Sequence, residues 1–262
     1  IESQFLSKLT DNLNAEIASG SVANIDDAVR WLSYTYLDIR ITKNPFHYGL
    51  NREQISDLGG IHEVKRKFII DAALELDRAK MVRFNEKIGS LACCDLGRTA
   101  SHFYIRHDSV QVYNTGIEKT ASISVMYLLD LIASSKEFEQ MRVRNEEMDE
   151  LDRLNKETEY KVVGGVENTA GKVNCLIQAY LNGSYARVSS LNSDMNYLDQ
   201  NISRIARGLF EIVRKYGMCH LTNELHKMCL GMENKMWWTW HPFYQFKTFV
   251  NKDTNRPAMD KI

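Results

Sequence analysis

The sequence predicts a mainly α-helical fold, in which a small region of three helices and a β-hairpin precedes a helical bundle. Apolar residues recur every three or four positions along most of the 262 residues, which is the period of an amphipathic helix. Only two short runs, residues 81–84 and 90–94, have the character of strands. One long segment, residues 194–217, separates an apolar stripe from a polar face over its whole length.

The N-terminal third has the order of a winged-helix domain. We expect helices over residues 3–19, 24–41 and 62–80, a loop over residues 48–60, and a hairpin turn over residues 85–89 between the two strand-like runs. Three helices followed by a hairpin are typical of this domain, which we place at residues 1–105. The third helix carries Glu63, Asp71, Glu75 and Asp77. This acidity disfavours contact with a DNA major groove, so we expect a packing role.

The remainder, residues 106–245, is predicted to be a bundle of helices. Helices are expected from residue 95 onward. The helix over residues 95–104 ends the winged-helix domain, and the helices of the bundle cover residues 109–115, 122–134, 145–156, 170–181, 194–217 and 221–235, after which an aromatic segment follows.

The long helix of the bundle has two unlike faces. Its apolar stripe consists of Leu198, Ile202, Ile205, Leu209, Ile212 and Val213. Its polar face consists of Gln200, Arg204, Arg207, Glu211 and Lys215. Ser193 or Asp194 can cap the helix, Arg214 and Lys215 suit its last turn, and Gly217 suits a left-handed stop. The polar face is either a solvated surface or a row of arginines that faces a phosphate backbone.

Composition limits the classes of function. Hydrophobic residues make up 44% and charged residues 26%, as in a soluble globular protein. The formal net charge of −1 excludes a generally basic nucleic-acid coat, so phosphate contacts need a local patch. Five cysteines, with Cys93 and Cys94 adjacent, fit a reduced intracellular protein. No apolar run approaches the ~18 residues of a membrane span, so we expect no membrane partner. The first residues contain no signal peptide and no initiator methionine, and we expect a piece of a longer chain.

Several motifs resemble one protein family. The runs DLGRTASHFY (residues 95–104), VENTAGKVNCLIQAYL (166–181), QNISRIARGLFEI (200–212) and PFYQF (242–246) are similar to the accessory region of two-cassette superfamily-2 DExH helicases. That family includes the spliceosomal RNA-unwinding helicase and the helicase subunit of the activating signal cointegrator complex. IESQF, AVRWLSYTYLDIR and NPFHYGL look most like the N-terminal cassette of the latter. The resemblance covers almost the whole chain.

The resemblance implies a fold and a function. In such helicases two RecA-like domains bind ATP and Mg, a winged helix braces them, and a helical bundle closes a channel over single-stranded DNA or RNA. One bundle helix, the ratchet helix, touches the strand. By resemblance this helix is residues 194–217, so that Gln200, Arg204, Arg207, Glu211 and Lys215 face the channel, and residues 246–262 begin a linker to a helix-loop-helix. Two positions depart from the family pattern. The family commonly has tryptophan where this chain has residues 216–219, and Leu and Arg where it has Phe243 and Tyr244.

The resemblance also implies a wider role, and an alternative remains open. The implied role is 3′–5′ DNA or RNA unwinding, with the RecA-like domains of the same chain and other complex subunits as partners. The implied location is nuclear and cytoplasmic, in DNA repair and ribosome quality control. The alternative is a scaffold that binds partner subunits and does not touch nucleic acid.

We expect no catalytic residue, cofactor or metal within the 262 residues. The sequence contains neither a phosphate-binding loop followed by Lys-Ser or Lys-Thr nor a DExH box. The spacing of Cys219, His220, His226 and Cys229 matches no common zinc site, and buried thiols are the simpler interpretation. Adjacent strand residues such as Cys93 and Cys94 point to opposite faces, which disfavours a catalytic pair.

Two further clusters have a structural and a functional interpretation. Trp237, Trp238 and Trp240 could stack on bases, but a cluster of tryptophans more often anchors the end of a bundle. The acidic run Glu146, Glu147, Asp149, Glu150 and Asp152 is either a solvated helix face or a docking edge for a partner.

Overall fold

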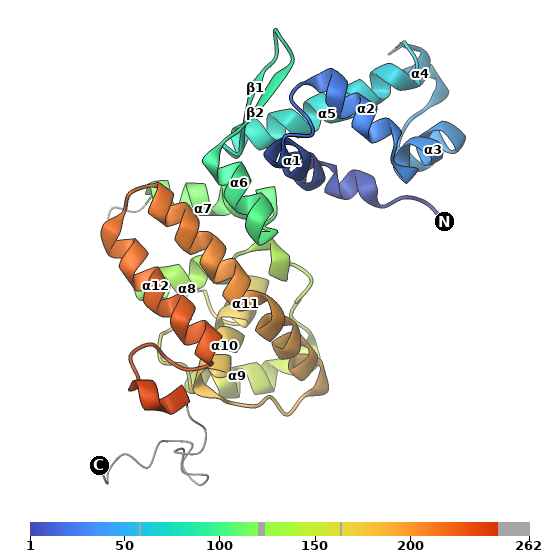
Figure 1. The fold of residues 1–262 in the computed structure, drawn as a ribbon. Helices are drawn as coiled ribbons and strands as arrows, with labels where there is room; N and C mark the ends of the chain where they lie inside the picture. Colours follow the sequence, from blue (N-terminus) through green and yellow to red (C-terminus); the bar gives the residue numbers. More distant parts are fainter. Residues whose placement is uncertain (58, 120–123, 163, 246–262) are drawn as a thin grey trace, which may run out of the picture. The chain divides into compact units, whose positions relative to one another are not determined.

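Figure 1 shows a computed structural model of the chain, which describes residues 1–57, 59–119, 124–162 and 164–245. Helices make up most of it, and the described residues contain one sheet of two strands. The predicted mainly α-helical class is therefore confirmed. The chain divides into two compact units, Ile1–Gln111 and Val112–Ile262, and each has buried apolar residues of its own.

Unit 1 consists of helices packed around the long helix α5, together with a β-hairpin. Its helices are α1 (Leu9–Ser19), α2 (Ile25–Ser33), α3 (Tyr36–Lys43), α4 (Arg52–Asp57), α5 (Ile61–Arg78) and α6 (Asp95–Phe103), with 3-10 turns η1 (Phe5–Lys8) and η2 (Pro45–Tyr48). Strands β1 (Val82–Asn85) and β2 (Ser90–Cys93) are antiparallel, with Val82 opposite Cys93. Helix α1 packs against α5 and α6, while α2 packs against α5.

Local signals account for the start of α2 and for a break that periodicity did not predict. The side chain of Asn24 accepts a hydrogen bond from the backbone N–H of Asp27, as expected of a cap. The predicted single helix over residues 24–41 is wrong, because the chain forms α2 and α3 with a break at Thr35. The Thr35 hydroxyl donates to the carbonyl oxygen of Leu32 at 2.7 Å. Such a bond offers the backbone an alternative to the helix.

The segment expected to be a loop, residues 48–60, contains a short helix. Helix α4 forms over Arg52–Asp57, where Arg, Glu and Gln have good helix propensity. Gly49, with a positive φ angle of 73°, ends the preceding turn η2, and Gly59, with a φ angle of 86°, follows the end of α4, where its backbone N–H donates to the carbonyl oxygen of Ser56.

Unit 2 is a helical bundle. Helix α7 (His107–Lys119) starts in the residues of unit 1 and continues into unit 2, and is longer than the predicted 109–115. The other helices are α8 (Val125–Ala133), α9 (Met148–Lys156), α10 (Thr169–Asn182), α11 (Ser189–Lys215) and α12 (Cys219–Asn234), with 3-10 turns η3 (Lys136–Phe138), η4 (Asn145–Glu147) and η5 (Pro242–Gln245). The predicted first residues of α8, Ser122 and Ile123, lie outside the described residues. Ser124 caps this helix.

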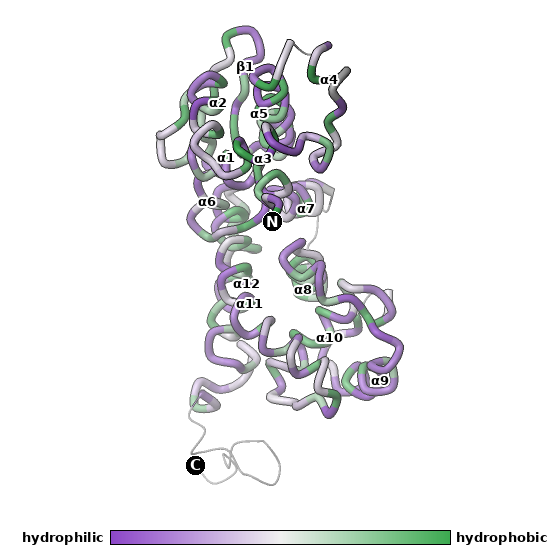
Figure 2. The backbone as a smooth tube through the Cα atoms, turned by 90° about the vertical axis from the view of Figure 1, so that its right-hand side faces the viewer, coloured by the Kyte–Doolittle hydropathy of each residue, from purple (hydrophilic) through white to green (hydrophobic). Residues whose placement is uncertain are grey.

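Helices α11 and α12 lie side by side, and α10 occupies the interior. Figure 2 shows the α11–α12 pair on one side of the unit and α8, α9 and α10 on the other. Residues 171–181 of α10 are all buried, and α10 contacts α8, α9 and α11. This arrangement means that α11 packs its inner side against the bundle over much of its length.

The start of α11 differs from the prediction. The helix begins at Ser189, five residues before Asp194, so neither Ser193 nor Asp194 is its cap. The Ser193 hydroxyl donates to the carbonyl oxygen of Ser189 within the helix. Asp194 is buried and binds a lysine, as described below. The predicted end is confirmed, because Gly217 has a positive φ of 72° directly after the last turn.

Candidate nucleic-acid interface

The apolar stripe of α11 fixes which side of this helix faces solvent. All six predicted stripe residues are 0% exposed. They pack toward α12, α10 and α8, the helices that α11 contacts. Because burial of this stripe is strongly favourable, the opposite side of α11 is held toward solvent.

The five predicted site residues lie on that opposite side. Gln200, Arg207 and Lys215 are exposed, whereas Arg204 and Glu211 are partly buried. The structure adds Arg214, whose side chain is 55% exposed on the same side. The sequence analysis assigned Arg214 only to the last turn, although its position along the helix also places it beside Arg207. With Arg214 added to the five predicted residues, the polar face of α11 from here on consists of six residues, Gln200, Arg204, Arg207, Glu211, Arg214 and Lys215.

Each arginine of the polar face has an acceptor within the protein. Arg204 donates from Nη2 to Oδ1 of Asn201 at 2.7 Å. Arg214 donates from Nε and Nη2 to Oε2 of Glu211 at 2.9 and 2.6 Å. Arg207 donates from Nε to Oε1 of Glu233, which belongs to α12. Sequence reasoning missed Glu233, because periodicity identifies the face of one helix and not its partner on another.

The contact between Arg207 and Glu233 affects both ionisable groups. The hydrogen bond from Arg207 lowers the pKa of the Glu233 carboxyl, and the same bond raises the pKa of Arg207. The side chains are 51% and 33% exposed, so water screens the pair. We therefore expect it to contribute little to stability and to remain accessible to a ligand.

A second ion pair joins the end of α12 to α11. Nζ of Lys235 lies 2.6 Å from Oδ2 of Asp199. The Tyr180 hydroxyl donates to Oδ1 of Asp199 at 3.0 Å, and the Lys235 ammonium lies 5.5 Å from the centre of the Tyr180 ring. These contacts hold the C-terminal end of α12 beside α11, close to Glu233.

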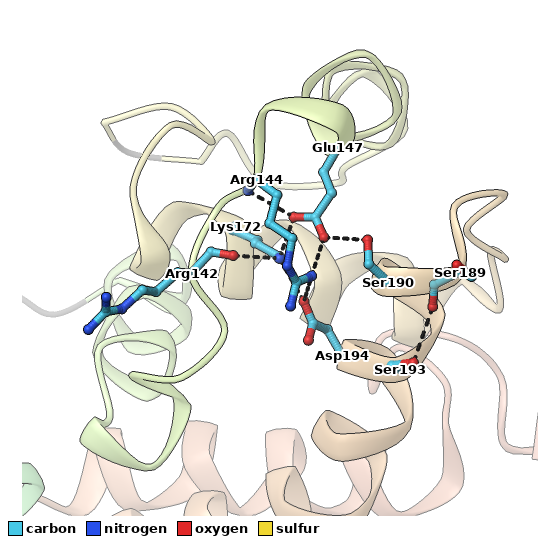
Figure 3. Close-up of polar contacts among 8 residues, drawn as sticks. All are labelled: Arg142, Arg144, Glu147, Lys172, Ser189, Ser190, Ser193 and Asp194. Atoms are coloured by element: carbon cyan, nitrogen blue, oxygen red, sulfur yellow. Dashed lines mark hydrogen bonds and ion pairs between the residues drawn. The ribbon is translucent and has the colours of Figure 1, made fainter.

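A buried ionic network holds the first turns of α11 (Figure 3). Lys172 of α10 is 0% exposed, and its Nζ donates to Oε2 of Glu147 and to Oδ2 of Asp194, each at 2.6 Å. It also donates to the carbonyl oxygen of Arg142 at 3.1 Å. A buried ammonium is tolerated only when such partners compensate its lost hydration. The network therefore fixes α11 to α10 and to η4, which carries Glu147.

Glu147 accepts hydrogen bonds from three side chains of this network. Besides Lys172, Arg144 donates at 2.5 Å and Ser190 at 2.6 Å, both to Oε1. Burial alone would raise the pKa of the Glu147 carboxyl, but these bonds outweigh it and lower the pKa from 4.5 to about 2. Of the two interpretations of this acidic run, a solvated helix face does not hold for Glu147. It does not hold for Glu150 either, which is 8% exposed and pairs with Arg153.

The cysteines and tryptophans have structural surroundings. Cys175 and Cys229 are buried, and burial raises the pKa of each thiol to about 12. Across the described part of the chain, no three His, Cys, Asp or Glu side chains group as a metal ion would require.

Trp237 is 1% exposed, and its Nε1 donates to Oδ1 of Asn182 at 2.5 Å. Its burial supports the interpretation that the cluster anchors the end of the bundle.

The two units and their helices match known protein families. A family model described as a Winged Helix-turn-helix domain matches residues 2–78, which form most of unit 1. A second model, described as the Sec63 Brl domain, matches residues 93–260. A winged helix followed by this helical domain defines the class of the protein as an accessory region of a DExH helicase.

Several helicases of this class are similar to the chain. An ATP-dependent DExH-box RNA helicase of Arabidopsis thaliana is 41% identical over 262 residues, which is 100% of this chain and 12% of the relative. Subunit 3 of the activating signal cointegrator 1 complex of Homo sapiens is 38% identical over 247 residues, covering 94% of this chain and 11% of the relative. The RQC trigger complex helicase of Saccharomyces cerevisiae is 39% identical over 270 residues, covering 100% and 14%.

The chain belongs to the Sec63 Brl domain family, whose model covers more than half of its residues. It spans between 11% and 14% of the length of these relatives. In the described ranges, no helix has the length and apolarity to cross a bilayer.

Proposed function

We propose that this chain guides single-stranded nucleic acid in an ATP-dependent DExH helicase, and that the polar face of α11 contacts the strand. The observation that carries the proposal is the polar face itself. A helix of 27 residues buries its stripe and presents three arginines and a lysine on its solvent side. Guanidinium groups bind phosphates by charge-assisted hydrogen bonds or stack on bases, and neither contact requires a particular nucleotide sequence.

The proposal assigns the chemistry of unwinding to other domains. The 262 residues have no phosphate-binding loop, so ATP and Mg would bind to RecA-like domains of the same protein. The accessory region would close the channel over the strand, with 3′–5′ unwinding of DNA or RNA as the activity of the whole protein. Names of the relatives refer to the activating signal cointegrator 1 and RQC trigger complexes. By analogy we propose complex subunits as partners, a nuclear and cytoplasmic location, and roles in ribosome quality control and DNA repair.

A double substitution tests the contact with the strand. We expect Arg204→Ala with Arg207→Ala, in the full-length protein, to weaken binding of a fluorescent oligothymidylate or oligouridylate. The salt dependence should also flatten, because each phosphate contact contributes about 0.7 to the slope of log affinity against log salt for a single strand, and a lost contact removes that contribution. Fluorescence anisotropy between about 50 and about 200 mM salt measures both.

The control variant removes a positive charge from a different helix. Arg153 of α9 pairs with Glu150 and Glu157, so Arg153→Ala removes an arginine away from the polar face. Each variant is first compared with the wild type by thermal melting. If affinity and salt slope of the double variant equal those of the Arg153→Ala variant, the polar face does not bind the strand.

The second candidate function is a scaffold that binds partner subunits. Its support is that each arginine of the polar face already has an acceptor in the protein. Scaffold contacts made of apolar surface would respond little to salt. An unchanged salt slope in the double variant, together with unchanged unwinding, would favour the scaffold.

A further inference from the structure

The guanidinium of Arg207 is shared between the solvent and a carboxylate of the neighbouring helix. Its Nε donates to Glu233 in the last turn of α12, and 51% of the Arg207 side chain remains exposed. A phosphate of a nucleic-acid strand binds guanidinium through the same N–H groups that bind a carboxylate. A phosphate that approaches Arg207 therefore meets a negative charge that already occupies part of its binding surface.

Glu233 stays near Arg207 even when their hydrogen bond is broken. The Tyr180 hydroxyl lies 3.1 Å from the carbonyl oxygen of Met232, directly before Glu233, and Lys235, two residues later, pairs with Asp199. Met232 is also 0% exposed and α12 packs along α11, so the helix that carries Glu233 is held beside α11. The carboxylate can turn away from Arg207 but cannot leave its surroundings, so it can return as soon as a phosphate departs.

The strength of the pair suits exchange. Exposed ion pairs contribute on the order of a few-fold in an equilibrium constant, because water screens the charges and both side chains lose freedom. A competitor of this strength weakens a phosphate contact without abolishing it. A strand that moves along the helix needs contacts that form and break repeatedly, so a few-fold weakening at Arg207 favours release.

We propose that Glu233 competes with the nucleic-acid backbone for Arg207 and thereby speeds release of the strand. The inference rests on the proposed function, because it concerns regulation of the same polar face. It assigns to Glu233 a role that neither its helix nor the polar face of α11 reveals when considered alone.

The test is the substitution Glu233→Gln in the full-length protein. Glutamine keeps an oxygen that accepts from Arg207 but removes the negative charge. We expect oligothymidylate to bind about two- to five-fold more tightly, mainly through slower dissociation in stopped-flow measurements.

Glu224→Gln is the matched control. Glu224 lies on α12 nine residues before Glu233, which is two and a half turns at about 3.6 residues per turn, so the two side chains point to opposite sides. Its carboxylate pairs with Lys227 at 2.8 Å. The control changes net charge equally, and we expect no tightening. Equal tightening in both variants would overturn the proposal, since it would show a general effect of charge.

A double variant separates this inference from the proposed function. With Arg207→Ala as the background, Glu233→Gln should have no effect on affinity, because the group for which it competes is gone. Tightening that persists in this background overturns the inference. If Arg207→Ala weakens binding while Glu233→Gln leaves dissociation unchanged, the inference fails and the proposed function stands. If Arg207→Ala has no effect on binding, the inference fails, and the double variant Arg204→Ala with Arg207→Ala decides whether the proposed function stands.

Discussion

Lys172 illustrates how much the position of one residue depends on partners far away in the sequence. Its ammonium is fully buried, and the two carboxylates that bind it come from residues 25 and 22 positions away. The hydrophobic pattern of α10 predicts burial of its apolar residues, but it gives no reason to bury a lysine. The network becomes visible only when α10, α11 and η4 are brought together.

Removal of the lysine should destabilise the protein strongly. Lys172→Met leaves Glu147 and Asp194 buried with fewer partners, and we expect the free energy of unfolding to fall by about 3–5 kcal/mol. Urea denaturation followed by circular dichroism measures the change. Lys227→Met, which breaks an exposed pair with Glu224, is the control and should cost less than about 1 kcal/mol. A similar loss in both variants would contradict the account of the network.

Stability should also depend on pH through Glu147. The folded state lowers the pKa of this carboxyl from 4.5 to about 2. A carboxyl group whose pKa is lower in the folded state than in the unfolded state stabilises the fold at pH values above its unfolded pKa. This stability is lost as the pH falls through its folded pKa. We expect the free energy of unfolding to fall between about pH 4.5 and pH 2. The slope should be smaller in Glu147→Gln, measured by denaturation at each pH, and an identical slope would exclude Glu147 as a source.

At the residue scale, the sequence predicted which face of α11 is buried, but it predicted less well which side chains contact one another. All six stripe residues of α11 are buried, as its periodicity predicted. The assignment of Gln200, Arg204, Arg207, Glu211 and Lys215 to strand binding remains a prediction. The sequence alone could identify some of the acceptors of these arginines but not all of them. Asn201 and Glu211 lie one helical turn from their partners, whereas Glu233 lies 26 residues away.

At the scale of elements, a side-chain cap and a close approach of two backbone segments occur together at the start of α10. The Asn168 side chain accepts from the backbone N–H of Gly171 at 2.7 Å, which caps the helix. A Cβ on Gly171 would lie 1.8 Å from the carbonyl oxygen of Gly165. The motif GGVENTAGK thus folds back on itself at the helix start, and only glycine allows the contact.

This contact predicts an unequal effect of two glycine substitutions. Gly171→Ala should lower the free energy of unfolding by about 2–3 kcal/mol, because backbone atoms must move to admit the methyl group. Gly217→Ala meets no atom within 4 Å, and its cost should be about 1 kcal/mol, from the positive φ alone. Thermal and urea denaturation of both variants measure the difference. Equal costs would show that the turn at Gly165 yields easily.

Periodicity predicted the existence of most elements and missed the boundaries that side chains set. The Thr35 hydroxyl bonds back to Leu32 at the break between α2 and α3, and Asp194, expected as a cap, instead binds Lys172 inside α11. Both are interactions of polar side chains, which a pattern of apolar residues does not record. Helix α4 was missed for another reason, since six residues are too few to show a helical period.

At the scale of the whole molecule, the order of the secondary-structure elements and the matches to protein families indicate the same two parts. Helices, a hairpin and then a bundle predicted a winged helix with a helical domain, and the two family models match these parts. The predicted boundary at residue 105 lies between α6 and α7, while the packing divides at Gln111, inside α7. The predicted boundary rests on where one helix ends, which is a local property of the sequence. The division by packing depends on all residue contacts within each unit. The position of the boundary therefore remains a prediction.

The central claim is that the polar face of α11 touches a single strand. A photo-crosslinking amino acid at Gln200, which is exposed on this face, tests it most directly in the full-length protein with labelled oligothymidylate. The same group at Asp152, exposed on α9, is the control. The account predicts a crosslink from position 200 that weakens with Arg204→Ala and Arg207→Ala, and little from position 152. Equal crosslinking from both positions, or none from position 200, would contradict it.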